Sequence, residues 1–184
     1  MSKGKLFVIS GASGVGKSTV LKQVMEARKD LTFSVSATTR LPRPGETDGV
    51  SYYFITREEF EDRIARGEFL EYDEHHAVLY GTLNSQILEK QEHGHVILDI
   101  EPNGAFNVRA KRPDATLFFL MPPSREELER RLRGRGDTSE EQIIIRMARA
   151  DWEMEQGAKY DHVVINDQVE TCAEEILKII AEKA

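Results

Sequence analysis

Short apolar runs alternate with segments of helical periodicity along this chain, and the alternation predicts its fold class. Four runs are too short for helices and lack polar alternation, which is typical of buried strands: residues 5–10 (KLFVIS), 95–100 (HVILDI), 116–121 (TLFFLM) and 162–165 (HVVI). Between them, apolar residues recur at helical spacing in residues 16–28, 83–92, 125–132, 140–156 and 169–183. Continuous apolar strands that alternate with helices predict an α/β fold with a parallel sheet flanked by helices.

Two regions interrupt this alternation. Residues 34–82 contain Pro42, Pro44 and Gly45, then aromatic residues at 51–55 and a short helical pattern near 58–66. This composition predicts an inserted lobe with its own strands. The second interruption, GRGDT at 134–138, indicates a flexible link between two charged helical stretches. The predicted organisation is a core formed by residues 1–33, 83–124 and 151–184, an inserted lobe at 34–82 and a charged helical region at 125–150.

Composition narrows the classes of protein that the chain can represent. The 184 residues contain 25 Lys and Arg against 32 Asp and Glu, a net charge of −7, which argues against nucleic-acid binding through bulk positive charge. The one cysteine, Cys172, excludes an internal disulfide and a cysteine-based zinc framework, and its place on an apolar helical stripe predicts core packing. No apolar run is long enough for a signal peptide or a membrane span, so we expect a cytoplasmic protein without a membrane partner.

The strongest motif lies between the first predicted strand and the first predicted helix. Its eight residues fit G-x-x-x-x-G-K-[ST] throughout: Gly11, Ala12, Ser13, Gly14, Val15, Gly16, Lys17 and Ser18. Glycines let the backbone N–H groups curl inward around phosphates, and the following helix N-terminus adds partial positive charge. Lys17 is then placed to bridge the β- and γ-phosphates, and the Ser18 hydroxyl to ligate Mg²⁺. The motif predicts a P-loop that binds a nucleoside triphosphate.

A P-loop alone does not separate switches, motors, transporter ATPases and small-molecule kinases. A guanine-reading N-K-x-D of GTPases does not occur in the sequence, because Asn166-Asp167 lacks the lysine between them. The chain is also too short to carry the assembly domain of a motor or transporter.

The inserted lobe offers candidates for a second substrate. Arg40 and Arg43 stand three residues apart beside two prolines, and guanidinium forks converging with tyrosine hydroxyls suit a phosphate monoester. Glu71 stands among aromatic and apolar residues, where a carboxylate can accept two N–H donors from the edge of a base. Taken alone, these residues fit equally well a solvated surface loop over a buried tyrosine pair.

Further motifs follow in a characteristic order: SVSATTRxPRPGExxGxxYYF from residue 34, then FLEY, YGT, LDI, LRGRG and VIND. In this set and order the chain resembles bacterial guanylate kinases, which are P-loop nucleoside monophosphate kinases, over nearly its whole length. The resemblance implies transfer of the γ-phosphoryl group of ATP to GMP and dGMP with Mg²⁺, in purine nucleotide metabolism and GMP recycling. It also implies that residues 34–82 form the GMP-binding lobe and residues 125–150 a lid.

The resemblance assigns site residues as well. For GMP it implies that Arg40, Arg43, Tyr52 and Tyr80 hold the phosphate and that Ser36, Glu71 and Thr82 read the guanine. It places Asp99 and Glu101 near the bound nucleotide, with Asp99 a second candidate metal ligand beside Ser18. For ATP it implies that lid arginines Arg131, Arg135 and Arg146 close over the phosphates and that Asn166 contacts the adenine, although a turn asparagine at a strand end explains Asn166 almost as well. The catalytic set is then Lys17, Arg40, Arg135 and Arg146.

The sequence departs from the family pattern at Ala12, where proline is common, and at Glu101-Pro102-Asn103, where a DIDxQG-like run is usual.

Two alternatives remain open. A non-catalytic scaffold domain would be expected to have a damaged P-loop, but Lys17 and Ser18 are intact. A P-loop kinase for another phosphorylated metabolite would have no reason to keep Glu71 in a guanine pocket. The sequence does not distinguish a monomer from a homo-oligomer.

Overall fold

The computed structural model describes residues 3–75, 77–134, 136 and 138–184. Its main element is a five-stranded sheet whose neighbouring strands are all parallel. In spatial order the strands are β2 (Leu31–Phe33), β7 (His95–Asp99), β1 (Leu6–Gly11), β8 (Thr116–Met121) and β9 (His162–Ile165). The predicted α/β class is confirmed, and β2 is a short strand that the sequence pattern did not reveal.

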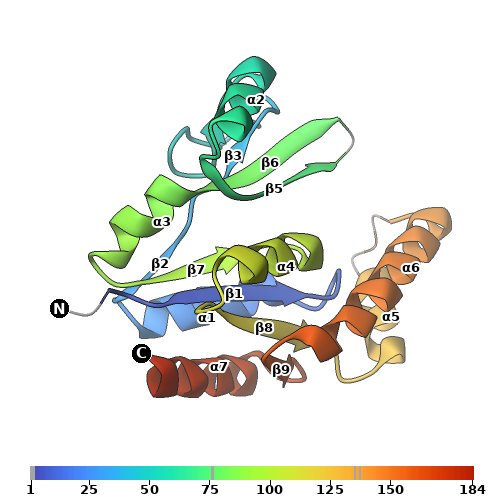
Figure 1. Ribbon diagram of the computed structural model, residues 1–184. Coiled ribbons are helices and arrows are strands. Elements are labelled where there is room, and N and C mark those ends of the chain that lie inside the picture. The colour runs from blue at the N-terminus through green and yellow to red at the C-terminus, as the bar shows by residue number, and fades with distance from the viewer. Residues whose placement is uncertain (1–2, 76, 135, 137) are drawn as a thin grey trace.

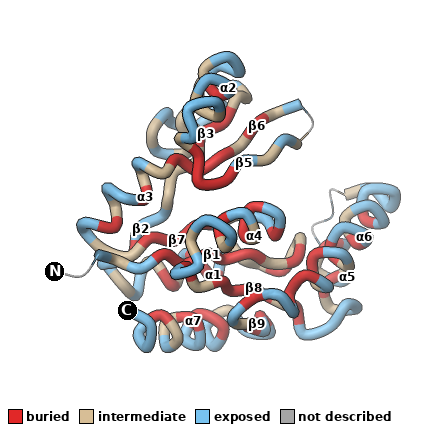
Figure 2. The backbone as a smooth tube through the Cα atoms, viewed as in Figure 1, coloured by how far each residue is buried: buried red, intermediate tan, exposed pale blue. Residues whose placement is uncertain are grey.

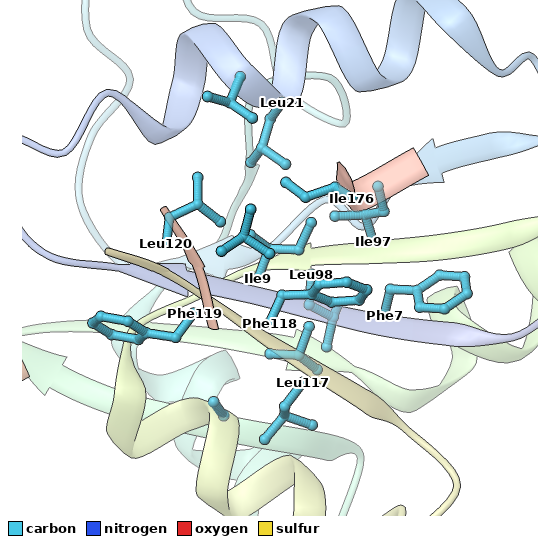
Figure 3. Close-up of a cluster of buried hydrophobic side chains, with 14 of the residues drawn as sticks. Phe7, Ile9, Leu21, Ile97, Leu98, Leu117, Phe118, Phe119, Leu120 and Ile176 are labelled. Carbon is cyan, nitrogen blue, oxygen red and sulfur yellow. The ribbon is translucent and has the colours of Figure 1, made fainter. Parts of the chain in front are cut away.

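Helices cover both faces of this sheet, as Figure 1 shows. They are α1 (Lys17–Ala27), α3 (Asn84–Gln91), α4 (Pro102–Lys111), α5 (Arg125–Arg133), α6 (Glu140–Gln156) and α7 (Val169–Lys183), with a 3₁₀ turn, η1, at Gly157–Lys159. Figure 3 shows Leu21 of α1 and Ile176 of α7 packed with Ile9 and Ile97 of the sheet. Cys172, also on α7, is fully buried in this core, as predicted.

The inserted region forms a second, four-stranded sheet in the order β4 (Tyr53–Phe54), β3 (Ala37–Thr38), β6 (Val78–Leu83) and β5 (Phe69–His75). Helix α2 (Arg57–Ala65) packs on it through Phe60, whose ring stacks on Phe69 with 4.3 Å between centroids. The prediction that this region has its own strands is confirmed. Strand β4 is shorter than the aromatic run at 51–55 suggested, because a turn precedes it in which the Asp48 carboxylate accepts the N–H of Phe54 at 2.9 Å.

The lobe contacts the core chiefly where strand β5 meets helix α4. At this seam the Lys111 ammonium group donates to the backbone oxygen of Phe69 at 3.2 Å. Figure 1 shows the β5–β6 hairpin on the same side of the molecule as helix α6, and Figure 2 shows that the outer side of α2 is exposed while the three central strands of the main sheet, β7, β1 and β8, are mostly buried. None of the helices in the described part of the chain is long and apolar enough to cross a membrane.

Candidate active site

The loop between β1 and α1 presents its backbone to a cavity of about 330 Å³, and all eight motif residues line that cavity. Gly14 and Gly16 have φ angles of 86° and 91°, in the left-handed region that favours glycine. A Cβ atom at Gly14 would lie only 2.6 Å from Leu132 Cδ2, so a larger residue there would have to displace Leu132 as well as adopt a strained backbone. Helix α1 has no side-chain cap at Gly16, which leaves its first N–H groups available to an anion.

Two buried polar side chains hold this loop from behind. The Glu153 carboxylate on α6 accepts the backbone N–H of Ser13 at 2.7 Å, and the Asn166 amide donates to the backbone oxygen of Val15 at 2.7 Å. Glu153 is 4% exposed and Asn166 2% exposed; the bond to Val15 is buried and the bond to Ser13 is partly buried. They fix the loop to elements more than a hundred residues away along the chain.

The position of Asn166 bears on its predicted contact with adenine. Its amide nitrogen already holds Val15, while its Oδ1 atom is buried and has no hydrogen-bond partner in the described part of the chain. Arg131, predicted to lie over the ATP phosphates, donates to the backbone oxygen of Asn166 at 2.9 Å and to Glu127 at 2.8 Å. In this structure both residues support the rim of the loop, and their contacts with ATP stay predictions.

We expect Asn166→Ala to lower the free energy of unfolding by about 1–3 kcal/mol, because the buried oxygen of Val15 loses its donor. ATP affinity should fall with it, since the loop loses an anchor. Urea unfolding followed by circular dichroism and ATP titration measure the two effects. The control is Asp167→Ala, an exposed neighbouring side chain. Equal stability losses in the two variants would contradict the anchoring role.

Basic side chains gather around the P-loop cavity. Lys17 forms an ion pair with Asp99, which ends strand β7 beside β1. Arg146 of α6 lines the cavity and makes no ion pair or hydrogen bond with the residues that the structure describes. Arg135, the remaining predicted lid arginine, lies outside the described residues.

Other arginines of the 125–150 region form surface ion pairs. Arg125 contacts Asp151 at 2.8 Å and Arg130 contacts Glu127 at 2.7 Å, so both serve in charge pairing. Arg133 similarly reaches Glu140. Exposed pairs of this kind contribute little to stability.

A second cavity, of about 350 Å³, lies between the lobe and the core. Six of the residues predicted to bind GMP line it: Ser36, Tyr52, Glu71, Tyr80, Asp99 and Glu101. The rings of Tyr52 and Tyr80 meet edge to face with 6.0 Å between centroids. Thr82 is fully buried behind the cavity and reaches it only through its hydrogen bond to Glu71.

Glu71 is the buried acid of this cavity, at 6% exposure. Its Oε1 atom accepts the Thr82 hydroxyl at 2.5 Å. Helix α4 approaches its other oxygen so closely that a Cβ atom on Gly104 would lie 2.9 Å from Oε2. Burial raises the pKa of the Glu71 carboxyl, and the hydrogen bond from Thr82 acts in the opposite direction. The result is a desolvated carboxylate with unused acceptor capacity toward the cavity.

Arg40 does not itself line this cavity; it forms a two-pronged ion pair with Glu46, with both nitrogen–oxygen distances 2.6 Å. The hydrogen bonds from Arg40, followed by that from the backbone of Arg43, lower the pKa of Glu46 to about 2. The Arg40 guanidinium also lies 4.8 Å from the centre of the Tyr52 ring. The Arg43 side chain is exposed and does not line the cavity. Its predicted contact with a phosphate therefore requires movement of the loop.

Comparison with known proteins assigns the family. The family model described as guanylate kinase matches residues 3–183. The chain belongs to the guanylate kinase family. It is 47% identical to a guanylate kinase of Fusobacterium nucleatum over 181 residues, covering 98% of this chain and 97% of the relative. It is also 47% identical to a guanylate kinase of Trichormus variabilis, with coverage of 95% and 88%.

A solved structure agrees with these relatives. The crystal structure of a guanylate kinase from Anaplasma phagocytophilum superposes with a TM-score of 0.76 at 32% identity, covering 99% of this chain and 87% of that one. The guanylate kinase fold thus extends over the sheet, the lobe and the helices that follow.

Sequence reasoning did not find every residue that shapes the two guanylate kinase cavities. It missed Asp73, His75, Gly104, Arg149 and Glu153, all of which line one cavity or both. The sequence around these residues contains no motif that marks them as site residues, because contacts between segments distant in sequence bring each of them to a cavity. The one hint was the three-residue spacing of Arg146 and Arg149, which puts both on one face of a helix.

Proposed function

We propose that this guanylate kinase transfers the γ-phosphoryl group of ATP to GMP and dGMP, giving ADP and GDP or dGDP. The observation that carries the proposal is that the P-loop cavity and the lobe cavity share three lining residues, Asp99, Glu101 and Arg149. A triphosphate in one cavity and a monophosphate in the other would therefore meet at their phosphate ends.

On the donor side, backbone N–H groups of the P-loop and the Lys17 ammonium group bind the β- and γ-phosphates. Mg²⁺ fits this site, because the Ser18 hydroxyl and the Asp99 carboxylate both line the P-loop cavity. The described residues contain no group of three or more His, Cys, Asp or Glu side chains that could hold a metal, and Mg²⁺ commonly needs only one or two protein ligands beside phosphate oxygens and water. When bound it neutralises charge between the phosphates.

On the acceptor side, Glu71 selects the base. Its carboxylate accepts the N1–H and the 2-amino group of guanine, with Ser36 and Thr82 around it. Adenine offers an unprotonated N1 and no 2-amino group, so it would leave a buried carboxylate facing a lone pair. Discrimination from unpaired polar groups can reach about 10⁴-fold.

The chemical step needs positioning more than proton transfer. Tyr52, Tyr80 and Arg40 orient the GMP phosphate so that one of its oxygens attacks the γ-phosphorus as the bond to the β-phosphate oxygen of ATP breaks. The second pKa of a phosphate monoester is about 6, so the nucleophile is mostly ionised at neutral pH without a general base. Arginines from the 125–150 lid, Arg146 among them, neutralise the charge on the transferred group and exclude water.

The proposed working units are the core, the GMP-binding lobe at 34–82 and the lid at 125–150. The lobe carries its own small apolar cluster, and this supports movement as one piece. We propose the cytoplasm as the place of action, because the single thiol, Cys172, is unpaired.

An acceptor panel tests the function. With Mg-ATP, the purified protein should phosphorylate GMP and dGMP at least about 10²-fold faster than AMP, CMP or UMP, for the reason given for Glu71. Coupled detection of ADP release measures each rate. Faster use of AMP or of a sugar phosphate would show that the pocket serves another acceptor.

A further inference from the structure

Arg149 occupies the place where the two nucleotide cavities meet. Three residues line both cavities. Asp99 and Glu101 are acidic, and Arg149 is the basic residue among them. The γ-phosphoryl group must cross from one cavity to the other at this junction. A guanidinium there lies where negative charge develops during transfer.

Arg149 is tied to the P-loop through a buried acid. Its Nε atom donates to Glu153 Oε1 at 3.0 Å, and Glu153 Oε2 accepts the N–H of Ser13 at 2.7 Å. The Glu153 side chain is 5% exposed, whereas that of Arg149 is 46% exposed. The Nε side of the guanidinium is therefore anchored, while its Nη atoms face the cavities.

The end of Arg149 is paired with a replaceable partner. Its Nη2 atom forms an ion pair with Glu101, whose side chain is 47% exposed. Glu101 precedes helix α4 without capping it, so its carboxylate is free to reach Arg149 and also His75 Nε2, at 3.3 Å. An exposed pair of this kind is weak, and a phosphate with more negative charge can displace one carboxylate.

We propose that Arg149 contacts the transferring γ-phosphoryl group. Glu153 holds its Nε atom, and its Nη atoms exchange Glu101 for phosphoryl oxygens when both nucleotides are bound. Arg149 thereby adds a cation to Arg146, one helical turn away on the same face of α6. This inference rests on the proposed function, because it assigns a residue to the same transfer. The competing explanation is that Arg149 serves only to connect α6 to the start of α4 through its ion pair with Glu101.

Kinetics of Arg149→Gln, Arg149→Lys and Glu101→Gln separate these explanations. Contact with the phosphoryl group predicts that R149Q loses about 10²-fold in kcat, while KM for ATP and GMP changes far less. R149K should recover part of the loss, because it keeps the charge without the fork. E101Q removes the exposed ion pairs of Glu101 with Arg149 and His75 but leaves Arg149 held by Glu153, so it should lose about fivefold in kcat, far less than R149Q. The matched control is Arg125→Gln, which removes another arginine that pairs with α6 and should leave kcat unchanged.

A second measurement detects the contact apart from turnover. Aluminium fluoride with Mg-ADP and GMP imitates the transferring group, and R149Q should weaken this complex about 10²-fold while binding Mg-ADP alone as the unaltered protein does. Thermal unfolding of each variant, with and without Mg-ADP, monitors folding. Equal weakening of both complexes, or equal kcat losses in R149Q and E101Q, would overturn the proposal in favour of the structural tie. If the unaltered protein phosphorylates GMP normally and R149Q has the same kcat, the role of Arg149 alone is overturned. If the unaltered protein does not phosphorylate GMP, the proposed function itself is overturned.

Discussion

Lys17→Ala should reduce kcat for GMP phosphorylation by about 10³-fold or more, the largest single effect that we expect. The ammonium group lines the P-loop cavity, where it neutralises the β- and γ-phosphates, and water cannot replace a fixed charge there. Folding should be preserved, because the ion pair that is lost, to Asp99, is partly exposed. Coupled ADP release measures the rate, and thermal unfolding checks the fold.

The matched control for this variant is Lys22→Ala, an exposed lysine farther along the same helix. It removes a positive charge close to the P-loop without removing a side chain from the cavity that the loop lines. Its kcat should stay within about twofold of the unaltered protein, as surface substitutions usually do. Activity of Lys17→Ala close to that of the control would show that the loop does not bind a triphosphate in the way proposed.

Glu71→Gln should raise KM for GMP by about 10²-fold with little change in KM for ATP. The amide keeps the shape of the side chain but offers one acceptor instead of two, and its NH₂ group opposes a guanine N–H donor. Steady-state kinetics with each substrate varied in turn measures the separation. Glu74→Gln is the control, because Glu74 lies on the same strand but is exposed and pairs with Arg57. An equal rise in KM for ATP would show damage to the fold rather than to the base pocket.

Acidification gives an independent check on Glu71. Burial raises the pKa of this carboxyl, and only its ionised form accepts both guanine donors. As pH falls, kcat/KM for GMP should therefore begin to decline at a higher pH than an ordinary glutamate would produce, and the Glu71→Gln profile should lack that step. The same step in both profiles would assign the titration to another group.

The elements that carry local signals were predictable from sequence. The P-loop is predicted by a motif of eight consecutive residues. Helices α6 and α7 have the predicted bounds, 140–156 and 169–183, because each has an uninterrupted helical pattern. The short strand β2 could not be predicted. Its three residues lie at the edge of the sheet, and their strand conformation depends on pairing with β7 rather than on a pattern of their own.

The fine structure of the site could not be predicted in the same way. The bond between Ser13 and Glu153 joins residues 140 positions apart, and neither residue hints at the other. The sequence predicts that Glu71 reads the guanine, but it does not predict the close approach of Gly104, which depends on how the lobe docks against α4. Asn166 shows the limit most clearly, because its motif suggested a ligand contact while its amide supports the P-loop backbone.

The burial of Cys172 has a practical consequence for watching this enzyme at work. It is the only cysteine of the chain, it is fully buried on the inner face of α7, and burial raises its pKa to about 11, so it stays protonated and unreactive at neutral pH. Cysteines introduced on the outer side of α2 and on α6 can therefore be labelled with a pair of dyes without removing the natural thiol. Energy transfer between the dyes would then report the distance between α2 and α6 through the catalytic cycle.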